Sequence, residues 1–498
     1  MHIFLFSGGE TFEESFACVT FVFSVYVRPA GGVRRRRQDT DGYYLLATSS
    51  DLKEFKELVD SGYLIAKGKL TNDIVLSSDK APCDWTEVGP IGPSSSREFL
   101  GVLDGQGYAI KGLYLEGKSS NTALVGILGA AGVIKNLTVS GHIKSTGSYT
   151  GAFAGTCHGS IINCVNNAEI TTSAGLVGGI AGSVDKNDGD TISIINCLNT
   201  GKITADGGAV AGITGSLGEG CKLENCVNTG DVNSTRSTGI GGIVGNMNDD
   251  SAVANCVNTG GVAASTPNWK WGGANNVGGI IGSASRNTTI TNCVSTGNVT
   301  ATPHPDDTSG KTGTYIGGIL GKATGENTVN CSWFKDSAIS PAHGIGGDGS
   351  YDNGRDEGTT SLDKKEKLPV SAILLDSYVK TGHTFELTAT AYPAESEQAA
   401  ALAVTAAEGL KLPPAELKSG EKTTFTVTEG TAGTEYKAEV SAGDASATFT
   451  VIPVDAPVTP TPEPDPTPSG SSSSGGCSAG FGALALLALL PLALRRRG

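Results

Sequence analysis

A glycine-rich phrase and an Asn-Cys phrase alternate seven times from about Thr122 to Trp333, and this repeat constrains the fold more than any other feature. Ile240-Gly-Gly-Ile-Val-Gly245 is an example of the first phrase, and Asn225-Cys-Val-Asn-Thr-Gly230 is an example of the second. The period varies from 27 to 38 residues, which is typical of repeat proteins. Each unit is short, rich in β-branched residues and punctuated by glycine, which predicts several short strands per unit.

A unit this small cannot bury an apolar face alone, so neighbouring copies must stack on one another. Parallel coils stack at about 4.8 Å per layer, and seven layers form a rod of roughly 35 Å. Stacking places the asparagines of successive Asn-Cys phrases above one another at a turn, where their side chains can hydrogen-bond along the rod. It also predicts an inward structural ladder of six thiols: Cys164, Cys197, Cys226, Cys256, Cys293 and Cys331.

The paired phrases resemble the GLUG repeat, which occurs in bacterial surface proteins and beside the catalytic domains of some IgA-specific metallopeptidases. The resemblance covers about 210 residues, and the segment from Phe99 to Leu113 is similar to the lead-in that such proteins carry. The resemblance implies a right-handed parallel β-helix. Stacking arguments agree with a β-helix, whereas the handedness comes from the resemblance alone.

Composition narrows the function classes. Glycine supplies 71 of 498 residues, about twice its usual share, which fits a repetitive β structure. The formal net charge of -14 argues against a nucleic-acid partner, because binding a polyanion needs a basic face.

Buried cysteine commonly behaves as a small hydrophobe. We therefore favour a packed thiol ladder over a metal site, expect no cofactor, and leave the pairing of Cys83, Cys157 and Cys221 open.

In the first forty residues, the order of the charged segments is the reverse of that in a secretory signal. An apolar run from Phe16 to Val27 follows acidic residues and precedes Arg34 to Arg37, which predicts an unusual leader or a wrongly placed start. Organised sequence begins at Asp41. Ser50 is expected to cap a helix from Asp51 to Val59, whose apolar face would cover the open end of the β-helix.

Beyond the rod, the pattern changes to longer strands with alternating apolar residues between Leu368 and Val454. This alternation predicts a small β-sandwich, and it resembles the immunoglobulin-like modules of bacterial surface proteins. A stretch rich in Pro, Thr, Ser and Gly follows from Asp455 to Gly476, and such a composition is typical of an extended spacer.

The C-terminal tail combines a Gly-Gly-Cys phrase, an apolar run from Ala479 to Leu494, and three arginines. In this order the three parts resemble the Synergist-CTERM sorting signal. The resemblance implies recognition by an intramembrane sorting protease and attachment at the cell surface or outer membrane; the alternative is an ordinary short membrane anchor. The sorting residues it implies are Gly475, Gly476, Cys477, Arg495, Arg496 and Arg497.

Two of the four tryptophans, Trp269 and Trp271, lie in one insertion between repeats, and they are our candidate ligand-binding residues. Exposed aromatic rings on a rigid scaffold commonly grip a sugar or an apolar partner. The alternative is that both rings fold back onto the rod. The sequence indicates an exported bacterial surface protein, most simply an adhesin that contacts an extracellular glycan, matrix protein or neighbouring cell.

No catalytic motif is recognisable: the sequence has neither His-Glu-x-x-His nor Gly-x-Ser-x-Gly, so we assign no catalytic residue. A polysaccharide lyase or glycosidase on the same scaffold is the alternative function, and Asp73, Asp104 and the loop from Asp185 to Asp190 offer carboxylates for it. A structural surface-layer component is the third possibility.

These inferences divide the chain into seven segments. They are 1–40, a leader or wrongly started N-terminus; 41–118, a cap and first coils; 119–336, the GLUG-repeat β-helix; 337–367, a polar linker; 368–454, an immunoglobulin-like β-sandwich; 455–476, a stalk; and 477–498, a sorting signal with a transmembrane segment.

Overall fold

The chain coils into a rod of stacked parallel strands, as its repeats predict. In this computed structural model the described residues are 38–76, 89–118, 120–173, 175–186, 193–235, 238–265, 276–302, 315–336, 341, 343–347, 354–381, 384–397, 400–401, 403–406, 416–417, 422–427, 436–442 and 445–451. Across these residues the rod strands pair in parallel, with each coil lying in register on the previous one. The described part of the chain is nearly all-β, and its long parallel sheets are consistent with the predicted β-helix.

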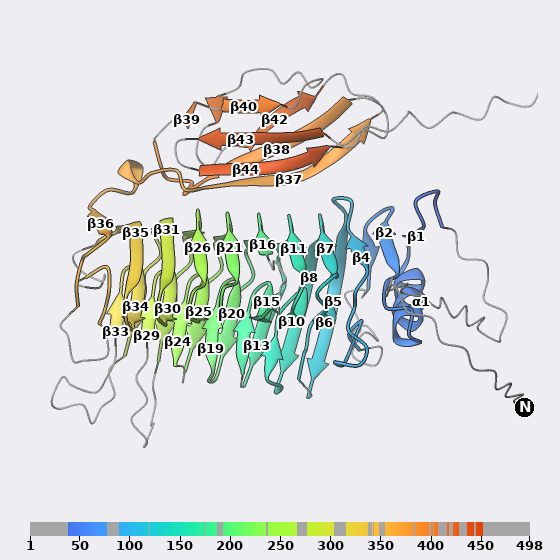
Figure 1. The fold of residues 1–498 in the computed structure, drawn as a ribbon, viewed down its shortest axis with the longest axis horizontal. Helices are drawn as coiled ribbons and strands as arrows, with labels where there is room; N and C mark the ends of the chain where they lie inside the picture. The colour runs from blue at the N-terminus through green and yellow to red at the C-terminus, as the bar shows by residue number, and fades with distance from the viewer. Residues whose placement is uncertain are drawn as a thin grey trace, which may run out of the picture.

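Figure 1 shows the coils side by side along the rod, and five strand rows make up its faces. One row contains β1 (Tyr43–Leu46), β2 (Lys67–Leu70), β4 (Val102–Asp104), β7 (Val133–Lys135), β11 (Ser160–Ile162), β16 (Ser193–Ile195), β21 (Lys222–Glu224), β26 (Ala252–Ala254), β31 (Thr288–Ser295), β35 (Asn327–Phe334) and β36 (Thr359–Leu362). The next contains β8 (Thr138–Ser145), β12 (Val165–Asn166), β17 (Leu198–Asn199), β22 (Val227–Asn228) and β27 (Val257–Asn258), and it continues into β31. The third contains β3 (Ile74–Val75), β5 (Ala109–Gly117), β8, β13 (Glu169–Thr172), β18 (Ile203–Ala205), β23 (Val232–Ser234), β28 (Val262–Ala264) and β32 (Val299–Ala301).

The glycine phrase of each repeat forms the other two rows, because it folds into two short strands around a tight bend. The six-stranded sheet contains β9 (Tyr149–Thr150), β14 (Leu176–Gly178), β19 (Ala209–Ala211), β24 (Gly239–Gly241), β29 (Asn276–Gly278) and β33 (Tyr315–Gly317). The seven-stranded sheet contains β6 (Val125–Leu128), β10 (Ala154–Cys157), β15 (Ala181–Val184), β20 (Thr214–Leu217), β25 (Val244–Met247), β30 (Ile281–Ala284) and β34 (Leu320–Ala323).

Glycine is required where these two sheets approach one another. A Cβ atom on Gly245 would lie 2.6 Å from the carbonyl oxygen of Gly215 and 2.8 Å from the backbone nitrogen of Val210. Both atoms belong to the backbone of the preceding repeat, so they cannot move aside as a flexible side chain would. The glycine phrase therefore sets the spacing between two sheets.

The Asn-Cys phrase supplies a corner and two rows of side chains. The asparagine before the cysteine has a left-handed backbone in every phrase but the last, that of Asn330, as at Asn225 with φ of 52°. Asparagine tolerates this conformation better than most residues. The second asparagine of the phrase is fully buried. Asn166 donates to Asn199 Oδ1 at 2.7 Å, Asn199 donates to Asn228 at 2.7 Å, and Asn228 donates to Asn258 at 2.8 Å. The predicted row of first asparagines is hydrogen bonded in part, since Asn163 donates to Asn136 Oδ1 at 3.2 Å and Asn225 donates to Asn196 Oδ1. The continuous amide ladder lies at the second asparagine.

The N-terminal end of the rod is covered by helix α1 (Ser49–Asp60), which lies beside β1 and β2 in Figure 1. Leu52, Phe55 and Val59 of this helix are buried in the rod core. The prediction that Ser50 caps the helix is wrong. Thr48 is the N-cap, because its hydroxyl accepts a hydrogen bond from Asp51 N and the Asp51 carboxylate accepts one from Thr48 N at 2.8 Å.

After the rod and a short 3-10 turn at Lys365–Lys367, the C-terminal part forms antiparallel strands. One three-stranded sheet contains β37 (Ala372–Thr381), β38 (Thr384–Tyr392) and β42 (Lys422–Val427), and another contains β40 (Ala403–Ala406), β43 (Tyr436–Ala442) and β44 (Ala445–Val451). A further pair joins β39 (Ala400–Ala401) to β41 (Glu416–Leu417). We call these strands the C-terminal module. No helix in the part of the chain that the structure describes is long and apolar enough to cross a membrane.

The start of the C-terminal module packs against the side of the rod. Val227, Val257 and Val294 point outward from successive coils and form one apolar cluster with Leu368, Ala372 and Leu374. At the same place, Asn225 hydrogen-bonds the backbone of Ile373. Figure 1 shows β37 running along the rod from this contact.

Candidate functional site

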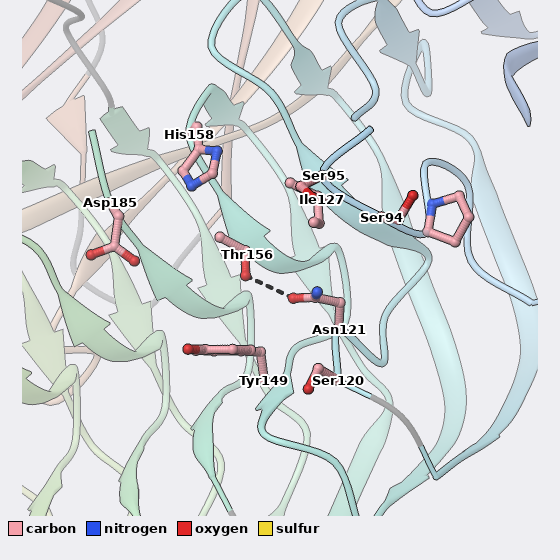
Figure 2. Close-up of a pocket in the computed structure, with 10 residues that line it drawn as sticks. Ser94, Ser95, Ser120, Asn121, Ile127, Tyr149, Thr156, His158 and Asp185 are labelled. Atoms are coloured by element: carbon pink, nitrogen blue, oxygen red, sulfur yellow. Dashed lines mark hydrogen bonds between the residues drawn. The ribbon is translucent and has the colours of Figure 1, made fainter. Parts of the chain in front are cut away.

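A surface cavity of about 580 Å³ lies near the N-terminal end of the seven-stranded sheet. Figure 2 shows Thr156 and Asn121 facing one another, with His158, Asp185 and Tyr149 around them. Its lining consists of Pro93, Ser94, Ser95, Ser120, Asn121, Ile127, Tyr149, Thr156, His158 and Asp185. Hydroxyl, amide and carboxylate groups beside an aromatic ring are the groups that bind a hydroxyl-rich ligand.

Three successive coils build the floor of this cavity. Ile127 on β6, Thr156 on β10 and Ser183 on β15 occupy the same register position, so their side chains form a row across the strands. Ser183 Oγ donates to Asp185 Oδ2 at 2.5 Å, which orients the carboxylate at the end of the row. Rigid strands therefore set the spacing of these groups.

One wall comes from the segment ahead of the repeats. Ile91 and Phe99 form parallel bridges with Val125 and Leu128 at the edge of β6. Backbone hydrogen bonds from Gly126 N to Ile91 O at 2.8 Å and from Ile127 N to Gly92 O at 2.9 Å hold this segment. The turn from Pro93 to Ser95 projects between these two anchor points and limits the cavity on that side.

The opposite wall depends on a left-handed residue and a glycine. Asn121 has φ of 64°, and its Oδ1 accepts a hydrogen bond from Thr156 Oγ1 at 2.7 Å. A Cβ atom on Gly155 would lie 2.4 Å from Asn121 Cα, so only glycine at that position lets this wall lie against β10. The hydrogen bond, drawn in Figure 2, fixes the amide at the cavity surface.

Among the described residues, two carboxylates and an imidazole lie at the site. Asp185 lines the cavity, while Glu98 lies beside it with Oε2 3.8 Å from His158 Nδ1. His158 Nδ1 is buried, and it has no hydrogen-bond partner among the described residues. None of the ten lining residues is Lys or Arg. The neighbouring Lys186 instead places its Nζ close to Gly220.

Of the residues that the sequence nominated for a ligand or a reaction, the structure describes Asp73, Asp104 and Asp185. Trp269 and Trp271, the sorting residues 475–477 and the arginines 495–497 all lie outside the described residues. Asp73 accepts hydrogen bonds from Ala109 N at 2.9 Å and Lys111 Nζ at 2.6 Å, and Asp104 holds the following turn through Gln106. Of the nominated carboxylates that the structure describes, Asp185 alone lines the cavity.

The thiols of the six repeat cysteines, Cys164 to Cys331, are buried and unpaired in the rod core. Their sulfur atoms lie against backbone carbonyls; Cys197 Sγ, for example, is 3.3 Å from Ile195 O and 3.6 Å from Ile161 O. Cys157 and Cys221 do not belong to this ladder. Burial raises the pKa of the Cys157 thiol to about 12 and that of the Cys221 thiol to about 11. Among the described residues, no group of three or more His, Cys, Asp or Glu side chains is arranged to hold a metal ion.

Sequence reasoning missed Asn121, Tyr149, Thr156 and His158 as site residues. The available signal was departure from the repeat: the position of Tyr149 is occupied by Leu176, Ala209 and Gly239 in the following coils. An aromatic side chain at Tyr149, followed by smaller side chains in the next coils, marks a place where the surface differs.

Comparison with known proteins supports the repeat assignment. Residues 273–300 match the GLUG motif. Halomucin from Haloquadratum walsbyi is 31% identical over 124 residues, which are 24% of this chain and 1% of halomucin. The chain therefore matches only a very small part of that relative's length.

A solved structure from Bacteroides ovatus, provisionally described as an immunoglobulin A1 protease, also aligns with this chain. It is 17% identical, and the alignment covers 65% of this chain and 86% of the other with a TM-score of 0.39.

Proposed function

We propose that this chain is an exported cell-surface adhesin whose β-helix binds an extracellular glycan in the cavity beside Tyr149. The GLUG match and the similarity to halomucin support an exported or surface protein. The observation that carries the binding proposal is the cavity itself, where Asn121, Thr156 and Asp185 converge beside an aromatic ring on a rigid scaffold. A flat sugar face packs on such a ring while its hydroxyls reach the polar groups.

The test is a glycan and matrix-protein array probed with the full-length protein and with a Tyr149→Ala variant. We expect glycan binding that this variant weakens by about tenfold or more, because a central aromatic contact contributes roughly 2 kcal/mol. Tyr108→Ala makes the same change at a tyrosine that is 39% exposed and does not line the cavity, so it should bind normally. Equal binding by both variants would refute the cavity as the site.

The sequence-based alternative site is tested in the same array. A Trp269→Ala, Trp271→Ala double variant should retain binding if the cavity is the principal site. Loss of binding in this double variant but not in Tyr149→Ala would transfer the function to the insertion. Binding to none of the glycans or matrix proteins by the wild type would favour a structural surface-layer role.

A second candidate function is cleavage of a polysaccharide, and one observation favours it. Glu98 approaches His158 and Asp185 lines the same cavity, so two carboxylates lie at one site. Paired acidic groups are the usual catalysts of glycoside hydrolysis. Incubation of each bound glycan with the wild-type protein, followed by an assay for new reducing ends, distinguishes cleavage from binding. Product formation that Asp185→Asn abolishes would establish an enzyme. An unchanged glycan would support the adhesin proposal instead.

The proposal includes attachment through the C-terminal tail, with the immunoglobulin-like module and the Pro/Thr stalk between rod and membrane. Sorting would remove the apolar segment after recognition at Gly475, Gly476 and Cys477. Mass spectrometry of the mature native protein tests this step. A mature chain that still contains the peptide from Leu484 to Leu494 would show that the tail is an ordinary anchor.

A further inference from the structure

The cavity beside Tyr149 has a charge that restricts which sugars it can hold. Asp185 lines it, Glu98 adjoins it through His158, and none of its ten lining residues is Lys or Arg. His158 contributes positive charge only when it is protonated. Among the described residues, the site therefore presents two carboxylates, and no Lys or Arg lines it.

We infer that Asp185 and Glu98 make this cavity selective for sugars without an acidic group, namely neutral hexoses and amine-bearing hexosamines. This inference rests on the proposed glycan-binding function and adds the chemical class of the ligand. Uronic, sialic and sulfated sugars carry an anion that would lie near both carboxylates, and like charges at short range repel.

Asp185 is the principal specificity determinant because its position is fixed. Ser183 Oγ donates to Asp185 Oδ2, and Asp185 N donates to Cys157 O at 3.0 Å, so both the side chain and the backbone are held. With one oxygen bound to Ser183, Oδ1 can accept hydrogen bonds from sugar hydroxyls or from an ammonium group. A carboxylate acceptor strengthens such hydrogen bonds relative to a neutral acceptor.

Glu98 reinforces this selectivity from a partly buried position. Its side chain is 22% exposed and that of His158 is 18% exposed, so solvent screens their charges less than it screens a fully exposed pair. The overall charge of -14 acts in the same direction by slowing the approach of acidic polysaccharides.

The experiment measures binding of the full-length protein at pH 8 to three oligosaccharides of equal length: a glucose oligomer, a glucosamine oligomer and a galacturonic acid oligomer. We expect the acidic oligomer to bind at least about tenfold more weakly than either of the others at low salt. That ratio should shrink as sodium chloride is raised, because salt screens the repulsion.

Variants then assign the selectivity to its residues. Asp185→Asn and Glu98→Gln, singly and together, remove charge with little change in size, and the double variant should bring the acidic oligomer to within about threefold of the glucose oligomer. Asp363→Asn makes the matched change at a side chain that is 79% exposed, outside the cavity lining, and it should leave the ratio unchanged.

The possible results separate the two proposals. An acidic oligomer that binds the wild type as tightly as the others would overturn the charge inference and leave the adhesin proposal standing. Unchanged selectivity in both single variants and in the folded double variant would also overturn it. If none of the three oligomers binds and the glycan array is also negative, the proposed function itself fails.

Discussion

The side-chain amide of Asn225 is hydrogen bonded to both polar groups of the Ile373 backbone. Its Nδ2 donates to Ile373 O, and its Oδ1 accepts from Ile373 N at 2.8 Å. Asn225 is 1% exposed and Ile373 is fully buried, so water cannot replace either bond. A corner residue of one repeat thus holds the first strand of the C-terminal module.

Replacing Asn225 by glycine should loosen this contact without straining the left-handed corner, because glycine adopts positive φ readily. We expect a loss of about 2 kcal/mol in the free energy of unfolding and faster hydrogen exchange at residues 372–374. Asn255→Gly is the matched control, because this corner asparagine also has positive φ and makes a 3.4 Å contact with Glu224 instead. Equal exchange in both variants would contradict the role of Asn225.

The buried amide ladder should contribute strongly to stability. Asn199→Ala removes a side chain that donates to Gly201 O and Asn228 Oδ1 and accepts from Asn166, leaving buried partners unsatisfied. We expect a loss of about 3 kcal/mol, measured by chemical denaturation. Thr200→Ala changes the adjacent exposed residue and should cost less than about 1 kcal/mol. A small effect at Asn199 would show that the ladder is not stabilising.

The glycine phrase should tolerate no side chain at its last position. Gly245→Ala forces a methyl group against the backbone of Val210 and Gly215, and we expect it to destabilise the protein by about 3 kcal/mol or more. Gly261→Ala meets only Asp231 Oδ1 at 3.1 Å and two atoms at 3.9 Å, so it should change stability by less than about 1 kcal/mol. Thermal unfolding that does not distinguish these two variants would argue against the close packing of the two sheets.

The buried thiols should resist alkylation in the folded protein. With a pKa of about 12, the thiol of Cys157 is about one part in ten thousand thiolate at pH 8, whereas an unfolded cysteine with an ordinary pKa ionises appreciably. Peptide-resolved mass spectrometry after iodoacetamide treatment should therefore find Cys157 and Cys221 labelled only in denaturant. Rapid labelling of either thiol in native protein would contradict its burial.

The same pKa shifts predict alkaline destabilisation. The folded-state pKa of Cys157 and that of Cys221 lie above the unfolded value, so the unfolded chain loses these protons first as the pH rises. Stability contributed by the two protonated thiols is complete below about pH 8.5 and declines between pH 8.5 and about 11 to 12. Denaturation curves should show a smaller decline in a Cys157→Ala, Cys221→Ala variant.

The β-helix was predictable because each repeat stacks on a similar repeat, so that equivalent residues become neighbours. Once the Asn-Cys phrase is placed in one coil, the position of Cys226 above Cys197 follows from stacking. Local alternatives were harder: Thr48 and Ser50 are both good N-cap residues, and the reciprocal bond with Asp51 decides between them. The cavity could not be predicted, because Pro93, Asn121 and Asp185 come from segments that only the coil geometry brings together.

The most direct test of the central claim is hydrogen exchange of the full-length protein with and without its best-binding glycan. If the cavity is the site, the ligand should slow exchange at residues 120–128 and 149–158, where Asn121, Tyr149 and His158 lie. Slowed exchange confined to residues 266–275 or to the C-terminal module, with none around Tyr149, would contradict the account.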